Sequence, residues 1–167
     1  DLAFPMKALG NDDPLYYSRE HIIYINAVFT LESAHLPLQR LADLACCSVL
    51  AFQQAHQYLG PEFAAMAAAN PRYAETMRQQ SQVEMLLAGR VDAIVMDRNI
   101  FRYYRQRVAP GSDGRAVQMW PLFPPTPYRV GFRSSQLRDD FDKGLQQLRS
   151  SGRYDAILRG WFAPDHD

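Results

Sequence analysis

The residue of this chain with the clearest chemical potential is Asp97, which ends a short apolar run from Val91 to Met96. A run of this length between polar residues is typical of a strand that is covered on both faces. In open α/β sheets, ligands bind just beyond the carboxyl ends of the strands. The carboxylate of Asp97 is therefore a candidate to meet a cationic group of a ligand. Its alternative role is to cap the helix predicted from Arg98 to Arg107, and the two roles are compatible.

A second candidate segment is Gln53-Gln54-Ala55-His56, which follows the predicted strand Cys47 to Phe52 and starts a short helix that runs toward Leu59. The start of a helix offers backbone N–H groups and the positive end of the helix dipole, which together favour an anion. Glutamine side chains add further donors. The alternative is an ordinary turn that faces solvent. His56 is interpreted as a surface or capping residue rather than a catalyst.

The sequence contains no recognisable catalytic arrangement. It has no nucleophile elbow, no phosphate loop, and no paired histidine and aspartate that would suggest general acid–base chemistry. Glu75 and Glu84 are interpreted as surface charges of a helix or a loop. We predict no catalytic residue and no cofactor, although residues distant in sequence can still pair in space, which keeps an enzyme as an alternative.

The two cysteines, Cys46 and Cys47, are adjacent. Neighbouring residues of a strand point to opposite faces, so a disulfide between them has poor geometry. We interpret both as small buried hydrophobic residues. The four histidines are scattered and no second cysteine cluster exists, so no metal site is predicted.

Composition places the chain among ordinary globular proteins, with 47% hydrophobic and 22% charged residues. Its formal net charge is zero. This balance argues against nucleic acid and anionic membranes as partners, because both attract basic proteins. No apolar run approaches the ~20 residues of a membrane span. The chain opens with Asp1-Leu2-Ala3-Phe4 rather than with a signal peptide, and we expect that a signal has been removed.

Strand and helix patterns alternate along the chain, which predicts an α/β fold with a mostly parallel sheet. Leu137, Phe141, Leu145 and Leu148 share one face of a closing helix, and a second closing helix follows Gly152. The remaining predicted helices are Leu36–Leu44, Pro61–Ala69 and Ser81–Ala88, and the remaining predicted strands are His21–Thr30, Tyr73–Met77, Ala116–Phe123 and Tyr128–Phe132.

Four segments, taken in order, resemble the family 3 extracellular solute-binding domain, the periplasmic binding proteins of polar amino-acid ABC transporters. They are Tyr16-Tyr17-Ser18-Arg19-Glu20-His21-Ile22, the helix Leu38–Leu44, the string Leu86-Leu87-Ala88-Gly89-Arg90-Val91-Asp92-Ala93, and the closing stretch from Phe141 to Trp161. The resemblance covers nearly the whole chain. It implies a type II periplasmic-binding-protein-like fold, a two-lobed clamshell of α/β lobes that traps its ligand between them.

The resemblance also implies how the chain is divided. Residues 1–30 would form part of lobe one and the first hinge strand, residues 31–119 lobe two, and residues 120–167 the second hinge strand and the helices that return to lobe one. Family members have a strand and a helix before the position of residue 1, so lobe one is expected to be incomplete. An incomplete lobe exposes apolar surface, which predicts a partner segment, a dimer or a domain swap.

In the family, an aspartate after a lobe-two strand takes the ammonium group of the ligand, and Asp97 matches it. Gln54-Ala55, flanked by Gln53 and His56, stands where a glycine-threonine pair usually offers its amides, and Tyr17 lies near the first hinge, where a ring can stack on ligand. The threonine-x-x-arginine of the family is absent, which puts amino-acid specificity in question.

The function that the resemblance implies is capture of a small polar solute, an amino acid or a related compound, for an ABC importer. The protein would be periplasmic or otherwise extracytoplasmic, with a membrane permease as its partner and no cofactor. Two alternatives remain open. One is the ligand-sensing module of a receptor, and the other is an enzyme on the same fold, such as a cyclohexadienyl dehydratase.

Overall fold

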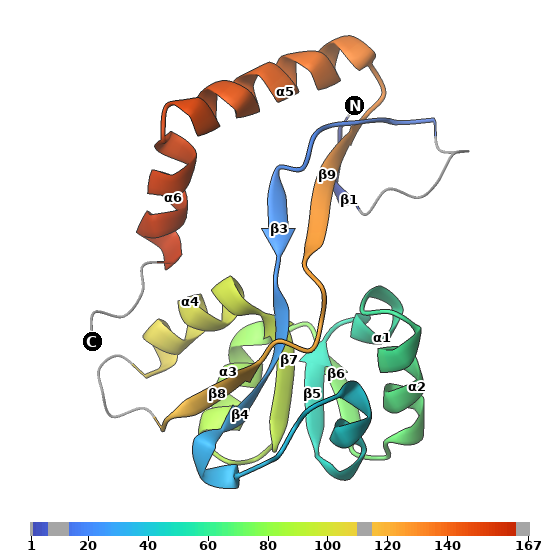
Figure 1. The fold of residues 1–167 in the computed structure, drawn as a ribbon, viewed down its shortest axis with the longest axis vertical. Helices are drawn as coiled ribbons and strands as arrows, with labels where there is room; N and C mark the ends of the chain where they lie inside the picture. The colour runs from blue at the N-terminus through green and yellow to red at the C-terminus, as the bar shows by residue number, and fades with distance from the viewer. Residues whose placement is uncertain (1, 7–13, 110–114, 163–167) are drawn as a thin grey trace. The chain divides into compact units, whose positions relative to one another are not determined.

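The computed structural model of the protein describes residues 2–6, 14–109 and 115–162, which fall into two compact units. The central unit comprises residues 25–124, and the terminal unit comprises residues 1–24 together with residues 125–167. The terminal unit is therefore built from both ends of the chain. Figure 1 shows the elements of each unit.

A five-stranded sheet forms the middle of the central unit. Its strands lie in the order β6 (Tyr73–Thr76), β5 (Val49–Phe52), β7 (Ala93–Asp97), β4 (Asn26–Leu31) and β8 (Val117–Trp120). β5 is parallel to β6 and β7, whereas β4 is antiparallel to β7 and β8. The expectation of a mostly parallel sheet is thus corrected to a mixed one. Helical crossovers connect the parallel strands β5, β6 and β7. The first and last strands of the unit, β4 and β8, are antiparallel to the strands beside them.

Helices cover both faces of this sheet (Figure 1). The 3₁₀ helix η2 (Leu41–Cys46) and the helices α1 (Ala55–Tyr58) and α2 (Pro61–Ala69) contribute to one core cluster. The helices α3 (Gln79–Leu87) and α4 (Arg98–Val108) contribute to the other. This is the layered α/β arrangement that alternating strands and helices predicted.

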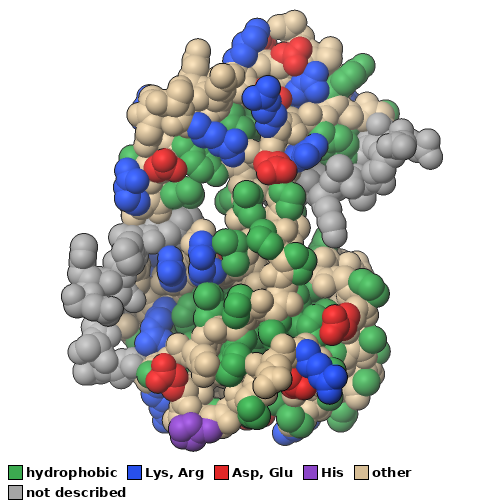
Figure 2. Space-filling view, viewed as in Figure 1, with side chains coloured by type: hydrophobic (Ala, Val, Ile, Leu, Met, Phe, Trp, Pro, Cys, Tyr) green, Lys and Arg blue, Asp and Glu red, His purple; other side chains and the backbone are tan. Residues whose placement is uncertain are grey.

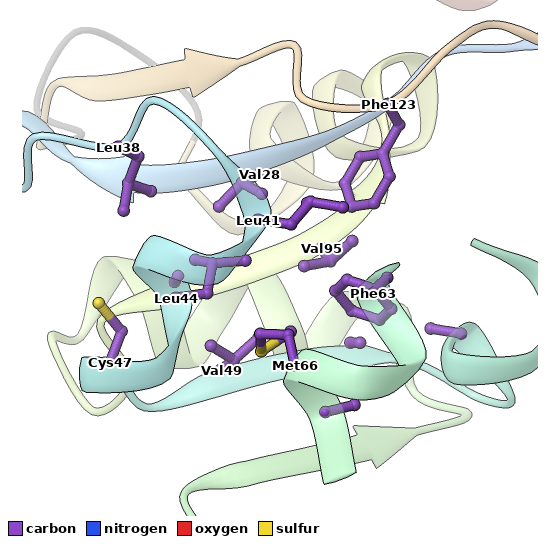
Figure 3. Packing of buried hydrophobic residues seen from close by; sticks show 14 residues of the cluster. Val28, Leu38, Leu41, Leu44, Cys47, Val49, Phe63, Met66, Val95 and Phe123 are labelled. Carbon is purple, nitrogen blue, oxygen red and sulfur yellow. The ribbon is translucent and has the colours of Figure 1, made fainter. Parts of the chain in front are cut away.

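Successive residues of each central strand enter opposite core clusters, as the two-residue period of a strand requires. In β7, Val95 belongs to the cluster under α2, and Ile94 to the cluster under α3. Every residue of β7 is buried, which confirms the prediction of a strand covered on both faces. Figure 3 shows the first cluster, with Phe63 of α2 next to Phe123; their ring centroids are 5.5 Å apart.

The terminal unit is organised around one long strand. β9 (Thr126–Phe132) pairs antiparallel with three short strands, β1 (Leu2–Met6), β2 (Tyr16–Tyr17) and β3 (Ile22–Tyr24). The two closing helices are α5 (Ser135–Ser150) and α6 (Arg153–Phe162). Leu145 of α5 is buried, and Phe141 packs with Phe132 of β9 at 5.4 Å between ring centroids, as the apolar face of the predicted helix indicated.

The expected helix Leu36–Leu44 forms only in its second half, as the 3₁₀ helix η2. Pro37 disfavours the α conformation of Leu36, so the chain first runs in an irregular path. The amides of Gln39 and Arg40 then donate to Asp43 Oδ2 over 2.9 and 3.0 Å and fix the start of η2.

The strand predicted from His21 to Thr30 is divided into β3 and β4, because at Ile25 the backbone N–H donates to the side chain of Asp97. The predicted loop Ala109–Gly114 lies mostly outside the described residues. None of the helices within the described ranges is long and apolar enough to cross a membrane.

Candidate functional site

Two of the segments that the sequence singled out lie at one edge of the central sheet. β5, β6 and β7 are mutually parallel in direction, so their carboxyl ends share an edge. Gln53 to His56 follow β5 directly, and Asp97 is the last residue of β7. The carboxyl edge of parallel strands is where open α/β sheets bind ligands. Tyr17, the remaining predicted site residue, belongs to the terminal unit.

Asp97 is buried, with 4% of its surface exposed, and its carboxylate has three backbone donors. Oδ1 accepts hydrogen bonds from the N–H groups of Asn99 and Ile100 over 2.8 and 3.1 Å, which makes Asp97 the N-cap of α4. Oδ2 accepts from the Ile25 N–H over 2.8 Å. Burial raises the pKa of Asp97, and these three amides oppose that rise. The capping role is therefore present, and one carboxylate joins the start of β4 to the start of α4.

The segment after β5 is organised by a residue that the sequence did not single out for this edge, Glu75 of β6. Its Oε2 accepts a 2.6 Å hydrogen bond from the Gln54 N–H, and its Oε1 accepts a 3.1 Å bond from the His56 N–H. The Tyr73 hydroxyl also donates to Oε1 over 2.6 Å, and Nδ1 of His56 lies 2.7 Å from the same oxygen. Glu75 is thus the internal anion of this helix start.

These contacts set the protonation of the cluster. Burial would raise the pKa of Glu75, but hydrogen bonds from the Tyr73 and His56 side chains and from the His56 and Gln54 amides outweigh it and lower the pKa to about 2. Burial, together with the neighbouring carboxylate, raises the pKa of the Tyr73 hydroxyl. Glu75 is therefore a carboxylate at neutral pH, and Tyr73 stays protonated as its donor.

Gln54 adopts a left-handed backbone conformation, with φ 62° and ψ 20°. Only glycine enters this region without steric cost, and other residues usually avoid it. Gln54 therefore holds a turn conformation that glycine adopts more readily. The side chains of Gln53, Gln54 and His56 are all exposed at this edge, whereas Ala55 is buried.

The interpretation of Glu75 as a simple surface charge is corrected by this geometry. Tyr73 and Glu75 are two residues apart in β6, so both side chains lie on the same face of the strand, and that alternation was visible in the sequence. What the sequence could not show is the parallel register, in which Ala51 of β5 lies opposite Glu75. In that register, the Glu75 carboxylate lies within hydrogen-bond distance of the Gln54 and His56 amides.

Tyr17 of β2 pairs with Gly131 of β9 and borders a polar concavity of about 590 Å³ in the terminal unit. The concavity is lined by the charged residues Arg19, Glu20, Arg129, Arg138, Asp142 and Arg149, among others. Figure 2 shows basic and acidic side chains interleaved over α5 of this unit. Within it, the Arg19 N–H donates to Asp142 Oδ1 over 2.8 Å. Two ion pairs also line the concavity: the Arg129 guanidinium lies 3.7 Å from Glu20 Oε1, and the Arg138 guanidinium lies 2.8 Å from Asp139 Oδ1.

Within residues 2–6, 14–109 and 115–162, no three or more histidine, cysteine, aspartate or glutamate side chains gather closely enough to hold a metal ion. Of the aromatic residues near the unit boundary, Trp120 donates from Nε1 to Thr30 Oγ1 over 2.9 Å, and the Tyr24 and Tyr128 rings are 4.7 Å apart. These rings take part in packing and hydrogen bonding inside their own units.

No family model matches the chain, and no curated protein matches it. Solved structures do match. An ancestral arginine-binding protein bound to glutamine is 21% identical, with a TM-score of 0.65 over 90% of this chain and 64% of that one. The amino acid ABC transporter substrate-binding protein AbpA of Streptococcus pneumoniae, bound to L-arginine, is 19% identical, with a TM-score of 0.66 over 89% and 61%.

A histidine kinase sensor domain with similarity to periplasmic binding proteins is 21% identical, with a TM-score of 0.66 over 89% of this chain and 63% of that one. The chain spans less than two thirds of the length of these structures. At this level of identity the likeness shows the fold. The chain has the α/β, type II periplasmic-binding-protein-like fold that amino-acid-binding periplasmic proteins share.

Proposed function

We propose that this chain is the ligand-binding part of an extracytoplasmic solute-binding protein that captures a small polar solute, an amino acid or a related compound, for an ABC importer. The proposal is supported by the fold together with the exposed polar side chains that lie at the carboxyl edge of β5, β6 and β7. A solute-binding role requires recognition without chemical turnover, and the edge offers donors and acceptors for recognition.

We assign residues 1–30 and 120–167 to lobe one and the hinge strands, and residues 31–119 to lobe two. The proposed ligand contacts are Gln53, Gln54, Ala55, His56 and Asp97 at the carboxyl edge, with Tyr17 on the side of lobe one. Because the Gln54 and His56 amides donate to Glu75, ligand hydrogen bonds from this segment would come chiefly from the exposed side chains.

A receptor sensor is the second candidate function. It is favoured by the likeness to a histidine kinase sensor domain, which is as close as the likeness to the transport proteins. In that case the partner is a signalling domain rather than a permease. Both functions predict that the protein binds a small solute. They differ in the partner that recognises the ligand-bound protein, which is a permease in one case and a signalling domain in the other.

The test is a thermal-shift screen with amino acids, polyamines and small carboxylates. A ligand that binds the folded state stabilises it by RT ln(1 + [L]/Kd), about 2.7 kcal/mol at a hundredfold excess over Kd. For a chain of this size such a gain raises Tm by several degrees. A flat screen on folded protein would contradict the solute-binding proposal.

Once a ligand is found, Asp97→Asn tests the site. Asparagine is also a good N-cap, so this change keeps the acceptor for α4 while it removes the charge. We expect affinity for a cationic ligand to fall at least about tenfold, consistent with loss of a charged hydrogen bond. Glu62→Gln, at an exposed position of α2, is the matched control and should leave affinity unchanged. Unchanged affinity of the Asp97→Asn variant would remove Asp97 from the site.

A further inference from the structure

The two adjacent cysteines bring their sulfur atoms together on one side of the chain. Cys46 is the last residue of η2, and Cys47 has extended backbone, with φ −107° and ψ 152°. This change from helix to extended chain removes the opposite orientation that two neighbours have in a strand, and the two Sγ atoms lie 3.7 Å apart. Cys47 is buried as expected, but Cys46 is exposed, which corrects the interpretation that both are buried.

The same geometry disfavours a disulfide. Both cysteines are free in the structure. The Cα atoms of neighbouring residues are about 3.8 Å apart across a trans peptide, whereas disulfides usually join Cα atoms about 4.4–6.8 Å apart. Oxidation to a disulfide would therefore strain this backbone. This geometry favours the dithiol form of the pair over the disulfide.

A single atom bonded to both sulfurs fits the observed separation. Two metal–sulfur bonds of about 2.3 Å that meet at a tetrahedral angle place the sulfurs about 3.8 Å apart. Thiolates select soft metals. Since the described residues provide no third histidine, cysteine or carboxylate for such a group, the bound atom must accept two sulfur ligands. We propose that Cys46 and Cys47 form a vicinal dithiol site for a thiophilic trivalent metalloid centre, which bonds two sulfurs at a bent angle.

The surroundings indicate the order of attack. Cys46 is open to solvent, and its Sγ lies 3.3 Å from the Asp43 carbonyl oxygen. Cys47 belongs to the core cluster seen in Figure 3, with its sulfur at the edge of that cluster. Burial and the Cys46 sulfur raise the pKa of Cys47 to about 12, and the Arg72 guanidinium opposes this rise. Cys46 therefore reacts first, and Cys47 closes the chelate from within the protein.

Phenylarsine oxide is a suitable probe because its trivalent arsenic bonds two thiols without any change of oxidation state. Two As–S bonds form, the bonds from arsenic to oxygen break, and the two thiol protons leave with that oxygen as water. No oxidant or reductant is needed. The adduct is counted by intact-protein mass spectrometry as one phenylarsenic group gained and two hydrogens lost.

The experiment compares wild type with Cys46→Ala and Cys47→Ala after labelling and challenge with excess monothiol. Chelation makes the second bond intramolecular, so we expect wild type to release the arsenical at least about a hundredfold more slowly than either variant. A small dithiol should strip it from wild type. Cys46→Ala changes an exposed residue and keeps the test valid if Cys47→Ala fails to fold. Release from wild type as fast as from Cys46→Ala would overturn the proposal, whatever the outcome of solute screening.

Discussion

The carboxylate of Glu75 accepts a 2.6 Å hydrogen bond from the backbone N–H of Gln54, which ties the end of β6 to the turn that follows β5. The His56 N–H joins the same carboxylate. The amides that the sequence predicted for an anionic ligand group thus already have an internal anion. A ligand at this edge meets an ionised glutamate and side-chain donors, which differs from the free amides of a glycine-threonine turn.

Glu75→Gln should destabilise the protein by about 2 kcal/mol at neutral pH, because a charged acceptor is replaced by an amide that has a donor in place of one oxygen. The pKa of Glu75 is about 2 in the folded state and 4.5 ordinarily, so its contribution is complete above pH 4.5 and is lost as pH falls toward 2. Urea unfolding between pH 7 and pH 2.5 should show wild type and variant converging in this window.

Glu84→Gln is the matched control for that series. Glu84 is exposed on α3 and accepts a bond from Gln80 on its own helix. Its substitution should change the free energy of unfolding by less than about 0.5 kcal/mol at any pH in the series. A difference between wild type and the Glu75 variant that stayed constant from pH 7 to pH 2.5 would show that ionisation of Glu75 does not stabilise the fold.

Gln54→Gly should leave stability unchanged or raise it by up to about 1 kcal/mol. Glycine relieves the cost of about 1–2 kcal/mol that a side chain meets in the left-handed region, although its unfolded state has more entropy. Gln53 precedes it without a positive φ, so Gln53→Gly should destabilise by about 0.5–1 kcal/mol. The sign of the difference between these two variants, measured by thermal unfolding, decides whether Gln54 is strained.

Asp97→Ala should lower the free energy of unfolding by about 2–3 kcal/mol, because it removes the N-cap of α4 and the acceptor of the Ile25 N–H together. Asp97→Asn should cost clearly less, since one oxygen still accepts. Denaturant unfolding of the two variants gives the comparison. Equal losses would mean that the charge of Asp97, rather than its capping geometry, stabilises the fold.

In the terminal unit, Tyr154→Phe should lower stability by about 1 kcal/mol, because the Tyr154 hydroxyl donates to the His21 carbonyl over 2.6 Å and its ring remains in place. Tyr58→Phe is the control. Its hydroxyl lies 3.4 Å from Gln54 Oε1 at an exposed position, and we expect no measurable loss. Hydrogen exchange should localise the Tyr154 effect to α6 and the segment around His21. Similar behaviour of the two variants would contradict this.

The sequence predicted the fold class and most elements because their signals are local. The string from Leu86 to Asp97 encodes a helix end, a glycine turn with φ 68° at Gly89, and a buried strand, and each is present. The mixed pairing of the central sheet was not predictable in this way. Neighbour relations such as β4 beside β7 depend on contacts between residues about seventy positions apart.

The candidate site was predicted in part for the same reason. Asp97 is recognisable from its place after an apolar run, and its capping of α4 follows from the helix that begins at Arg98. Glu75 is less obvious, because its partners come from the strand beside it. The Cys46–Cys47 sulfur contact depends on a helix-to-strand transition at one peptide, which residue patterns locate only to within a few positions.

The pairing of β9 with β1, β2 and β3 has a consequence for biosynthesis. All three early strands find their partner in residues 126–132, whereas the central unit is contiguous from residue 25 to residue 124. A ribosome adds about 5–20 residues per second, so β9 is synthesised roughly 5–20 s after β1, β2 and β3. The central unit can already fold during this time. During that interval three unpaired strands are exposed to chaperones and to other nascent chains.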